Sequence, residues 1–431
     1  MISKKTVVIG AGAAGMMAAG AAAENGASVT LLEKNPKVGR KLMITGKGRC
    51  NILNNCDIPT FISNVPVNGR FLYSALNNFS PSDAYGFFES IGVPLKTERG
   101  NRCYPESDKA VDVVDALRRY VLDRGVTIIR DTARSLELED GVIAGVRGDK
   151  QTYFADSVII CCGGKSYPLT GSTGDGYALA EQAGHTVTEL KPSLVPVESD
   201  DPDCKSMQGL SLRNVALKII DNQTQKPVYT DFGEMLFTHF GMSGPMILSA
   251  SSHIREIVPR RYTASIDLKP ALDFSQLDKR LQRDFSENIN RDVSNSFSKL
   301  LPRKIIVPVL KRWGVPFDKK CNAVTREERR TLCEILKSFT VSLSGFRPIE
   351  EAIVTSGGVK TSEINPKTME SKLVEGLYFA GEVIDIDAYT GGFNLQIAWS
   401  TGRLAGEKAS SVTLDPIRGR CHDGAVRAPD L

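Results

Sequence analysis

The sequence of 431 residues is poor in the side chains that build metal and disulfide sites. It has only four histidines, and its nine cysteines form neither a CxxC pair nor a zinc-ligand spacing. This pattern argues against a disulfide framework and against a metal centre, and it fits reduced thiols in a cytoplasm. We therefore expect a cytoplasmic protein without a bound metal.

Long apolar runs and a strong charge excess are also missing. The most apolar segment, residues 7–23, is mainly Gly and Ala and ends at Glu24, which is too short to span a bilayer. The first residues, MISKKTVVIG, lead from two lysines into a strand pattern without a signal-peptide core. A net charge of +4 does not by itself indicate a nucleic-acid or membrane surface. The length predicts two or three domains, whose partners must be inferred from local sites.

The chain begins with the pattern of a dinucleotide-binding βαβ unit. An apolar run is followed by GAGAAG, an alanine-rich helical stretch and a second strand, ASVTLLEK. Gly10 permits the tight turn, Gly12 lets the backbone approach a pyrophosphate, and Gly15 lets the helix pack on the strand. The helix N-terminus presents free N–H groups to phosphates, and Glu33 ends the second strand where a carboxylate accepts from ribose hydroxyls. These features predict a dinucleotide site.

The next loop favours FAD over NAD. The stretch GRKLMITGKGRCN, residues 39–51, packs four basic side chains among three glycines. An NAD dehydrogenase would continue into another βα unit, whereas such a loop can wrap over the pyrophosphate and run towards a flavin ring. Arg40 and Lys41 would neutralise phosphate, and Gly46 and Gly48 would allow close backbone approach. The alternative interpretation is a solvated basic loop.

A second glycine-rich segment, residues 154–185, predicts a closing strand, a glycine turn and a helix on the same sheet. Cys161 and Cys162 in this segment would point to opposite faces of the strand. We interpret them, and Cys50, as small packing residues rather than as redox partners of the flavin.

A third segment, residues 376–409, predicts a short strand and, after the Gly391–Gly392 turn, a helix. A helix N-terminus at this point would stabilise the negative charge of a reduced flavin and favour hydride acceptance. Glu382, Asp385 and Asp387 lie close to the turn, where they bind ribityl hydroxyls or serve as ordinary loop caps.

The middle of the chain has a different pattern. Alternating stretches in 191–272 predict a small antiparallel sheet or barrel. Residues 273–340 turn helical and carry fifteen Lys/Arg against nine Asp/Glu, which fits a solvated face or a surface for an acidic partner. His239, in GEMLFTHFGMSGP, is either a proton donor to a substrate or a packed side chain. No GxSxG motif or hydrolase triad is visible.

Together these motifs resemble the BaiN-like (YhiN-like) family of flavoproteins, often described as NAD(FAD)-utilising dehydrogenases. The blocks VVIGAGAAGMMAA, GRKLMITGKGRCN, GEMLFTHFGMSGP, EAIVTSGGV and GLYFAGEVIDIDAYTGGFNLQIAWSTG occur in that family's order. The resemblance implies an α/β fold in which a discontinuous Rossmann-like domain binds FAD non-covalently and carries an inserted β-rich, barrel-like domain and a small helical domain. We expect the FAD-binding domain at 1–190 and 345–411, the β-rich domain at 191–272, the helical insert at 273–344, and a disordered tail at 412–431.

The resemblance also implies site residues, position by position. Contacts to FAD fall on the fingerprint, the basic loop, the Gly48 to Asn51 corner and the Glu382 to Asn394 region, with a backbone contact to adenine at Ala133. One departure is VIICCGG, which has two cysteines where Ala and Thr are more usual. The full set of expected cofactor contacts is Gly10, Gly12, Ala13, Ala14, Gly15, Glu33, Lys34, Arg40, Lys41, Thr45, Gly46, Gly48, Arg49, Cys50, Asn51, Ala133, Gly163, Gly381, Glu382, Asp387, Gly391, Gly392, Phe393 and Asn394.

The expected activity is hydride exchange between flavin N5 and a small organic substrate, with reduction of an activated C=C bond (an enone) by a nicotinamide donor as the leading hypothesis. Because no second GxGxxG unit is present, NAD(P)H would have to visit the substrate cavity. His239 or Tyr389 would protonate the α-carbon. The alternatives are a flavin oxidase of an amine or amino ketone, a flavoprotein that binds nucleic acid through the basic helical insert, and a flavin-binding sensor without turnover. No membrane partner is expected.

Overall fold

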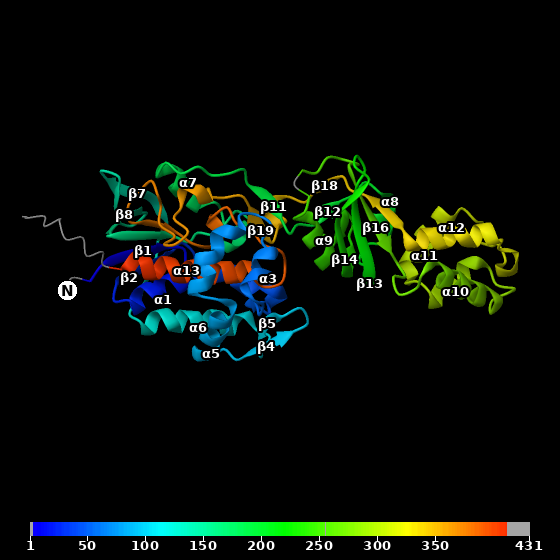
Figure 1. Cartoon of the computed structure of the whole chain (residues 1–431), viewed down its shortest axis with the longest axis horizontal. Helices are drawn as coiled ribbons and strands as arrows, with labels where there is room; N and C mark the ends of the chain where they lie inside the picture. Colours follow the sequence, from blue (N-terminus) through cyan, green and yellow to red (C-terminus); the bar gives the residue numbers. More distant parts are fainter. Residues whose placement is uncertain (1–2, 255, 412–431) are drawn as a thin grey trace, which may run out of the picture.

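Three lobes follow one another along the long axis of the molecule (Figure 1). The computed structural model describes residues 3–254 and 256–411, and the tail predicted to be disordered, 412–431, lies outside the described residues. We call the three parts the first lobe (3–190 and 357–411), the sheet lobe (196–272 and 338–347) and the helical lobe (273–337).

The first lobe is built on a five-stranded parallel sheet with the strand order β20-β10-β1-β2-β6. The two interior strands β1 and β10 are buried along nearly their whole length, as is usual for parallel strands covered on both faces. This sheet confirms the predicted Rossmann-like class. The strands are β1 Lys5–Ile9, β2 Ser28–Glu33, β6 Thr127–Arg130, β10 Ser157–Ile160 and β20 Leu377–Phe379.

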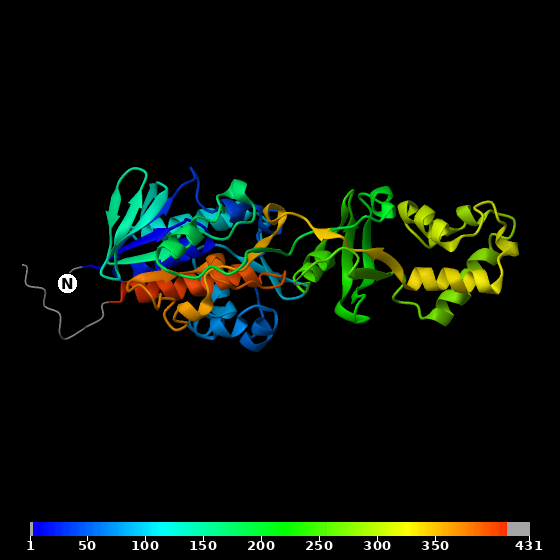
Figure 2. The ribbon, with the colours of Figure 1, turned by 90° about the horizontal axis from the view of Figure 1, so that it is seen from above.

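Two helices from opposite ends of the sequence pack closely against each other in this lobe. The helix α1 (Ala13–Glu24) lies beside α13 (Phe393–Ser410) in both ribbon views (Figures 1 and 2). A Cβ atom on Gly402 of α13 would lie only 2.5 Å from the carbonyl oxygen of Ala14. Glycine is therefore required there, because backbone packs directly on backbone.

Further elements surround this core. An antiparallel sheet of β7, β8 and β9 packs beside β10, and a smaller one of β3, β5 and β4 lies near the start of α13. These elements are β3 Leu53–Asn54, β4 Leu95–Glu98, β5 Arg102–Pro105, β7 Ala133–Glu139, β8 Val142–Gly148, β9 Thr152–Phe154, α2 Arg40–Ile44, α3 Ile58–Ser63, α4 Tyr73–Asn78, α5 Pro81–Ser90, α6 Ala110–Asp123 and α7 Asp175–Gln182.

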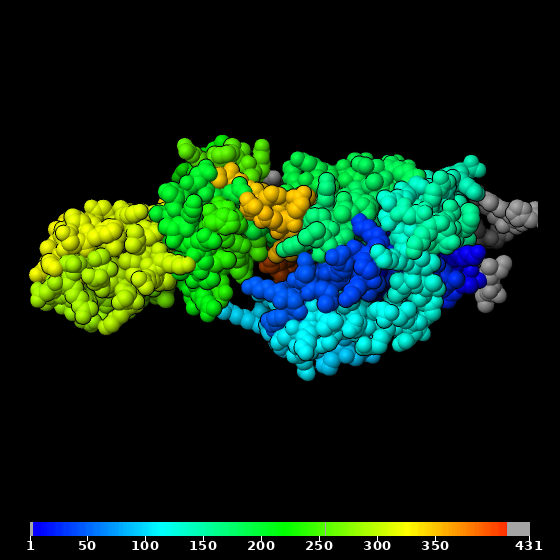
Figure 3. All heavy atoms as spheres, turned by 180° about the vertical axis from the view of Figure 1, so that it is seen from behind, coloured from blue at the N-terminus to red at the C-terminus, as the bar shows by residue number. Residues whose placement is uncertain are grey.

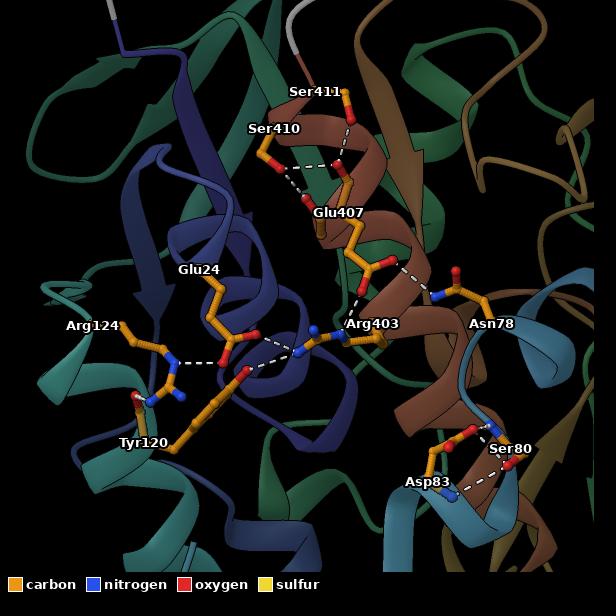
Figure 4. A network of polar contacts seen from close by, with 11 residues as sticks. Glu24, Asn78, Ser80, Asp83, Tyr120, Arg124, Arg403, Glu407, Ser410 and Ser411 are labelled. Carbon is orange, nitrogen blue, oxygen red and sulfur yellow. Dashed lines mark hydrogen bonds and ion pairs between the residues drawn. The ribbon is translucent and has the colours of Figure 1, made fainter. Parts of the chain in front are cut away.

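A network of charged side chains fastens α1, α6 and α13 together (Figure 4). Arg403 of α13 pairs with Glu24 at the end of α1 and with Glu407 one turn further along α13. Glu24 also pairs with Arg124, directly after α6, at 2.7 Å. Its members are only partly buried, so each pair stabilises the fold by about 1 kcal/mol or less.

The chain leaves and re-enters the first lobe through a double-stranded ribbon, seen between the lobes in Figure 2. The outgoing β11 (Lys191–Ser193) pairs antiparallel with the returning β19 (Val354–Ser356). A few residues further out, β12 (Val197–Glu198) pairs with β18 (Gly345–Phe346). The ribbon therefore restrains how the sheet lobe sits on the first lobe.

The sheet lobe is a seven-stranded antiparallel sheet with the order β17-β16-β13-β14-β15-β12-β18. The stretch 339–346 pairs with β16 through its first half and with β12 through its second half, so one length of chain joins the two ends of the sheet, in agreement with the barrel-like domain expected from the sequence. In β13, buried and exposed residues largely alternate, which is the period-two pattern of a half-buried strand. The elements are α8 Pro202–Ser206, β13 Ser211–Asp221, β14 Lys226–Phe237, β15 Gly241–Ser243, α9 Pro245–Ser251, β16 Tyr262–Asp267 and β17 Phe339–Ser342.

The helical lobe contains α10 (Phe274–Ser286), α11 (Arg303–Trp313) and α12 (Arg326–Lys337). Capping boxes at Asp273 and Thr325 start α10 and α12. The helices end at Lys337, and the following residues turn into β17 because they complete the sheet of the neighbouring lobe. Across the parts of the chain that the structure describes, none of the helices has the length and apolar character that a membrane crossing needs.

Candidate active site

A cavity of about 390 Å³ runs along the carboxyl edge of the parallel sheet, where α/β sheets bind ligands. It extends from the glycine fingerprint after β1 to the N-terminus of α13 and on to the sheet lobe, and Figure 3 shows the hollow between the first lobe and the sheet lobe. Most predicted site residues lie in its wall: Gly10, Gly12, Ala13, Ala14, Glu33, Lys34, Arg40, Lys41, Thr45, Gly46, Asn51, Ala133, Gly163, Gly381, Glu382, Tyr389, Gly391, Gly392 and Asn394.

The glycine fingerprint leaves the start of α1 open to the cavity. Gly12 is the N-cap, and no side chain of residues 3–254 or 256–411 caps the helix. The N–H groups of the first turn are therefore free to bind an anion. A Cβ atom on Gly12 would meet no atom of the described part of the chain within 4 Å, whereas one on Gly15 would lie 1.8 Å from the Gly10 carbonyl oxygen. Gly15 thus packs the helix on the strand and does not line the cavity.

Glu33 is fixed in the cavity wall by three hydrogen bonds. One carboxylate oxygen accepts from the Ala11 N–H at 2.9 Å. The other accepts from the backbone N–H and the side-chain amide of Asn35, each at 2.8 Å. A carboxylate has about four acceptor positions, so Glu33 keeps capacity for a hydroxyl of a ligand.

The basic loop brings two cations to the wall. Lys41 pairs with Glu382 at 2.7 Å, which joins the loop after β2 to the loop after β20. Arg40 donates to the side-chain oxygen of Asn35 at 2.7 Å and remains exposed. Lys34, also in the wall, pairs with Asp175. Arg40 is therefore the cation of this group that keeps its charge free of a carboxylate within the described residues.

The N-terminus of α13 forms the far end of the cavity. Its N-cap Gly392 has φ 100° and Gly391 has φ 126°, conformations that favour glycine. The amide oxygen of Asn51, oriented towards Gly392, accepts its N–H at 3.0 Å. Asn394 accepts from the Ala388 N–H at 2.9 Å and donates to its carbonyl oxygen at 2.7 Å. These bonds fix the positive end of the helix dipole beside the cavity.

Tyr389 lies in the wall next to this helix start and contacts the sheet lobe. Its ring stacks on the imidazole of His253, with the ring centroids 4.6 Å apart and the planes 16° from parallel. Its hydroxyl lies 3.5 Å from Nδ1 of His253. Burial raises the pKa of Tyr389 and lowers that of His253. Both side chains are therefore uncharged at neutral pH.

His239, the other predicted proton donor, lies outside the cavity. It is exposed on the sheet lobe after the end of β14, with its ring edge-on to Phe240 at 5.0 Å. The histidine near the cavity is His253, which follows α9. No sequence motif surrounds His253, because only the docking of the sheet lobe brings it to Tyr389.

Three neighbouring predicted contacts are also placed behind the wall. Gly48 does not line the cavity, and Arg49 pairs with Glu98 and Asp108 instead. Cys50 is fully buried, which raises its thiol pKa to about 12 and makes it unreactive. Sequence spacing placed these residues in the loop but could not show which way their side chains turn.

Asp387 and Phe393 likewise face away from the cavity. The two oxygens of Asp387 accept from Ser193 of β11 at 2.7 Å and Ser356 of β19 at 2.8 Å. Phe393 packs edge-on against Phe61 with centroids 5.2 Å apart. Asp387 therefore anchors the ribbon, and Phe393 belongs to the core.

Several wall residues carried no signal in the sequence. The half-buried Arg102 of β5 lines the cavity and forms no ion pair with a carboxylate of the described residues. An arginine keeps its charge at any physiological pH. The part of the wall next to the sheet lobe is largely apolar and comprises Leu194, Pro245, Leu248, Ile353 and Val354.

The residues present fit a bound FAD. A dinucleotide needs N–H groups that bind its phosphates and an acceptor for its ribose hydroxyls at the end of the next strand. A flavin also needs the positive end of a helix dipole near its ring system. The open space at Gly12, the fixed carboxylate of Glu33 and the start of α13 at Gly392 provide these in one continuous cavity. The fold and cavity define the class of FAD-dependent oxidoreductases.

Comparison with known proteins identifies the family. Residues 4–408 match the HI0933-like protein Rossmann domain, and the chain belongs to this family, which confirms the resemblance seen in the sequence. It is 31% identical over 411 residues to the 3-dehydro-bile acid delta(4,6)-reductase of Clostridium scindens, covering 94% of this chain and 98% of that protein. It is also 31% identical over 398 residues to the ribosomal RNA dihydrouridine synthase of Escherichia coli, covering 92% of this chain and 95% of that protein.

Among solved structures, the 3-ketosteroid delta1-dehydrogenase of Sterolibacterium denitrificans is similar with a TM-score of 0.51. The alignment covers 95% of this chain and 100% of that chain at 13% sequence identity. At this identity the likeness concerns the fold alone.

Proposed function

We propose that the protein reduces a C=C bond conjugated to a carbonyl group, using FAD in the cavity and a nicotinamide as electron donor. The observation that carries this proposal is Tyr389, an uncharged acid in the wall beside the start of α13. Reduction of such a bond requires a hydride at the β-carbon and a proton at the α-carbon. Tyr389 supplies the proton donor at the end of the cavity where the flavin ring is expected.

Residues along the cavity would hold the cofactor in order. The N-terminus of α1 at Gly12 would bind the pyrophosphate, Glu33 the ribose, and Ala133 the adenine. Lys41 and the start of α13 would face the flavin portion. Bound FAD would supply the hydride from its N5 atom.

The chain's own groups then serve the substrate. The apolar side chains of Leu194, Leu248 and Ile353 would exclude water and accept a flat carbon skeleton. Arg102 would donate to the carbonyl oxygen and stabilise the negative charge that develops there. Tyr389 would then give its hydroxyl proton to the α-carbon.

The names of two relatives support the reaction type. A delta(4,6)-reductase of a 3-dehydro bile acid removes ring double bonds from a 3-oxo steroid. A dihydrouridine synthase saturates the uracil ring of uridine. In both products a C=C bond next to a carbonyl has gained two hydrogens. For this chain, the substrate and the donor are part of our proposal.

An anaerobic visible spectrum tests the proposal. The full chain is reconstituted with FAD, NADH or NADPH is added, and a steroid 4-en-3-one or an RNA containing uridine is supplied before air is admitted. We expect bleaching by a nicotinamide and return of colour with one of the conjugated carbonyl compounds. Absence of flavin binding would refute the cofactor site, and recolouring only in air would indicate an oxidase.

A uracil base in RNA is a second candidate substrate, favoured by the charge of the helical lobe. Within the described residues, six exposed basic side chains there have no carboxylate partner: Lys279, Arg291, Arg303, Lys304, Lys311 and Arg326. Lysine and arginine that neutralise phosphates make binding fall steeply with salt.

This candidate is tested with the full chain and a ribosomal RNA fragment. The double variant Arg303→Glu/Lys311→Glu is compared with Lys109→Glu, an exposed lysine of the first lobe. We expect weaker RNA binding and a flatter salt dependence only for the double variant, with a gain of two hydrogens on uridine by mass spectrometry in the wild type. Equal RNA binding by the wild type, the double variant and Lys109→Glu would argue against RNA as the substrate and favour a small molecule.

A further inference from the structure

Three aromatic rings cross the boundary between the first lobe and the sheet lobe. Between Tyr389 and Tyr229 of β14 lies the imidazole of His253, with centroid distances of 4.6 and 4.7 Å. The Tyr229 hydroxyl donates to Asp231, an exposed carboxylate, at 2.7 Å. The imidazole therefore lies between the cavity and the charged surface of the sheet lobe.

From this arrangement we infer that His253 is a positioning residue that returns a proton to Tyr389 after each turnover, an inference that rests on the proposed function. In the reaction, the Tyr389 O–H bond breaks as the α-carbon C–H bond forms, which leaves a phenolate. His253 gives the proton on Nδ1 to that phenolate while its Nε2 takes one from solvent. Each turnover then consumes one solvent proton and the hydride supplied by reduced FAD.

The geometry supports this role over simple packing. The separation of 3.5 Å between the Tyr389 hydroxyl and Nδ1 of His253 is long for a hydrogen bond. Such bonds are often long without substrate and shorten when the reacting groups are in place. The near-parallel stacking holds the phenol ring, so the hydroxyl reaches the cavity in a fixed orientation.

The pair exists only when the two lobes are docked. Tyr389 belongs to the first lobe, and His253 follows α9 of the sheet lobe. A second contact of α9 lies beside it, because the hydroxyls of Ser249 and Thr390 are 3.1 Å apart. The packing of α9 against the first lobe therefore brings His253 to Tyr389, and the substrate is protonated only when the two lobes are docked.

Protonation of His253 would change the acidity of its neighbour. The groups that face the pair are Tyr229, with Asp231 behind it, and Asp387 on the side of Tyr389. An imidazolium next to the phenol stabilises the phenolate. The proton transfer should therefore accelerate as pH falls through the pKa of His253, which burial places below its usual value.

The test compares His253→Phe, which keeps a stacking ring without a titrating nitrogen, with Tyr389→Phe and with His239→Phe, an exposed histidine outside the cavity. Two reactions of the reconstituted protein are timed separately by stopped-flow absorbance. These are flavin reduction by NADPH and reoxidation by a steroid 4-en-3-one. The phenol of Tyr389 is also titrated in the apo-protein by ultraviolet difference spectra between variants with and without it.

We expect His253→Phe to slow reoxidation by about 10²-fold and to remove its acceleration at low pH, with flavin reduction unchanged. His239→Phe should behave as the wild type. In the apo-protein, His253→Phe should shift the titration of Tyr389. The inference would be overturned if His253→Phe were reoxidised at the wild-type rate with the wild-type pH profile. It would also be overturned if the titration of Tyr389 were the same in His253→Phe as in the wild type. If no conjugated carbonyl reoxidises the wild-type flavin, the proposed function fails, while the titration still decides whether His253 and Tyr389 are coupled.

Discussion

Two glycines of the first lobe allow cofactor binding to be separated from folding. Gly12 has φ −85° and open space where a Cβ atom would go, so Gly12→Ala fits the apo-protein without strain. The new methyl group points into the anion cradle at the start of α1 and keeps a phosphate from the free N–H groups. Loss of charge-assisted hydrogen bonds worth about 2–3 kcal/mol would raise the Kd for FAD by about 30- to 150-fold.

Gly402→Ala should have the opposite effect, lowering the free energy of unfolding instead of the affinity for FAD. Its Cβ atom would lie 2.5 Å from the Ala14 carbonyl oxygen, and backbone atoms on both sides leave little room to relax. Overpacking of this kind lowers the free energy of unfolding by about 1–3 kcal/mol. FAD affinity is measured by fluorescence titration and stability by urea unfolding of the apo-proteins. If Gly12→Ala binds FAD like the wild type, or loses as much stability as Gly402→Ala, the assignment of the cradle is refuted.

Three further substitutions test other parts of the structure. Glu33→Gln removes the anionic acceptor beside Ala11 and should raise the Kd for FAD about tenfold, and unchanged titration curves would contradict that role. Arg403→Met should lower the unfolding free energy by about 1 kcal/mol, less at high salt, because the pair with Glu24 is screened. Burial raises the pKa of Asp387 above 3.8, so as pH rises the unfolded carboxyl ionises first and the wild type loses stability. The free energy of unfolding of Asp387→Asn, measured with urea, should therefore rise relative to that of the wild type between pH 3.8 and neutrality. A difference between the two proteins that does not change with pH would argue against this prediction.

The sequence alone predicted those parts of the site whose geometry is set by residues close together in the chain. Gly10, Gly12 and Glu33 lie in one βαβ unit whose spacing sets their geometry, so their positions at the cavity could be predicted. The start of α13 was found in the same way, from the Gly391–Gly392 turn. The alternation in 191–272 predicted a sheet or barrel, but it could not show that residues 339–346, which follow the helical lobe, join the two ends of the sheet, because alternation reports a buried face and not the partner of a strand.

Contacts between distant segments gave no such signal. His253 reaches Tyr389 only through the ribbon and the seating of α9, and neither leaves a pattern near residue 253. Asp387 looked like a ribityl ligand because it is close to the glycine turn in sequence. In the fold its two oxygens instead accept from one serine in each ribbon strand. Sequence distance indicated the neighbourhood, while the direction of each side chain depended on packing.

The close packing of α1 on α13 has a consequence for the synthesis of the chain. The strand β10 pairs with β20, and α1 needs α13, yet β20 and α13 follow both inserted lobes in the sequence. On the ribosome the sheet lobe and the helical lobe are translated before the first lobe has its last strand. Pairings across such sequence separations also form slowly. Cofactor uptake at α1 therefore waits until α13 has been translated, and a bound flavin reports that all three lobes have been made.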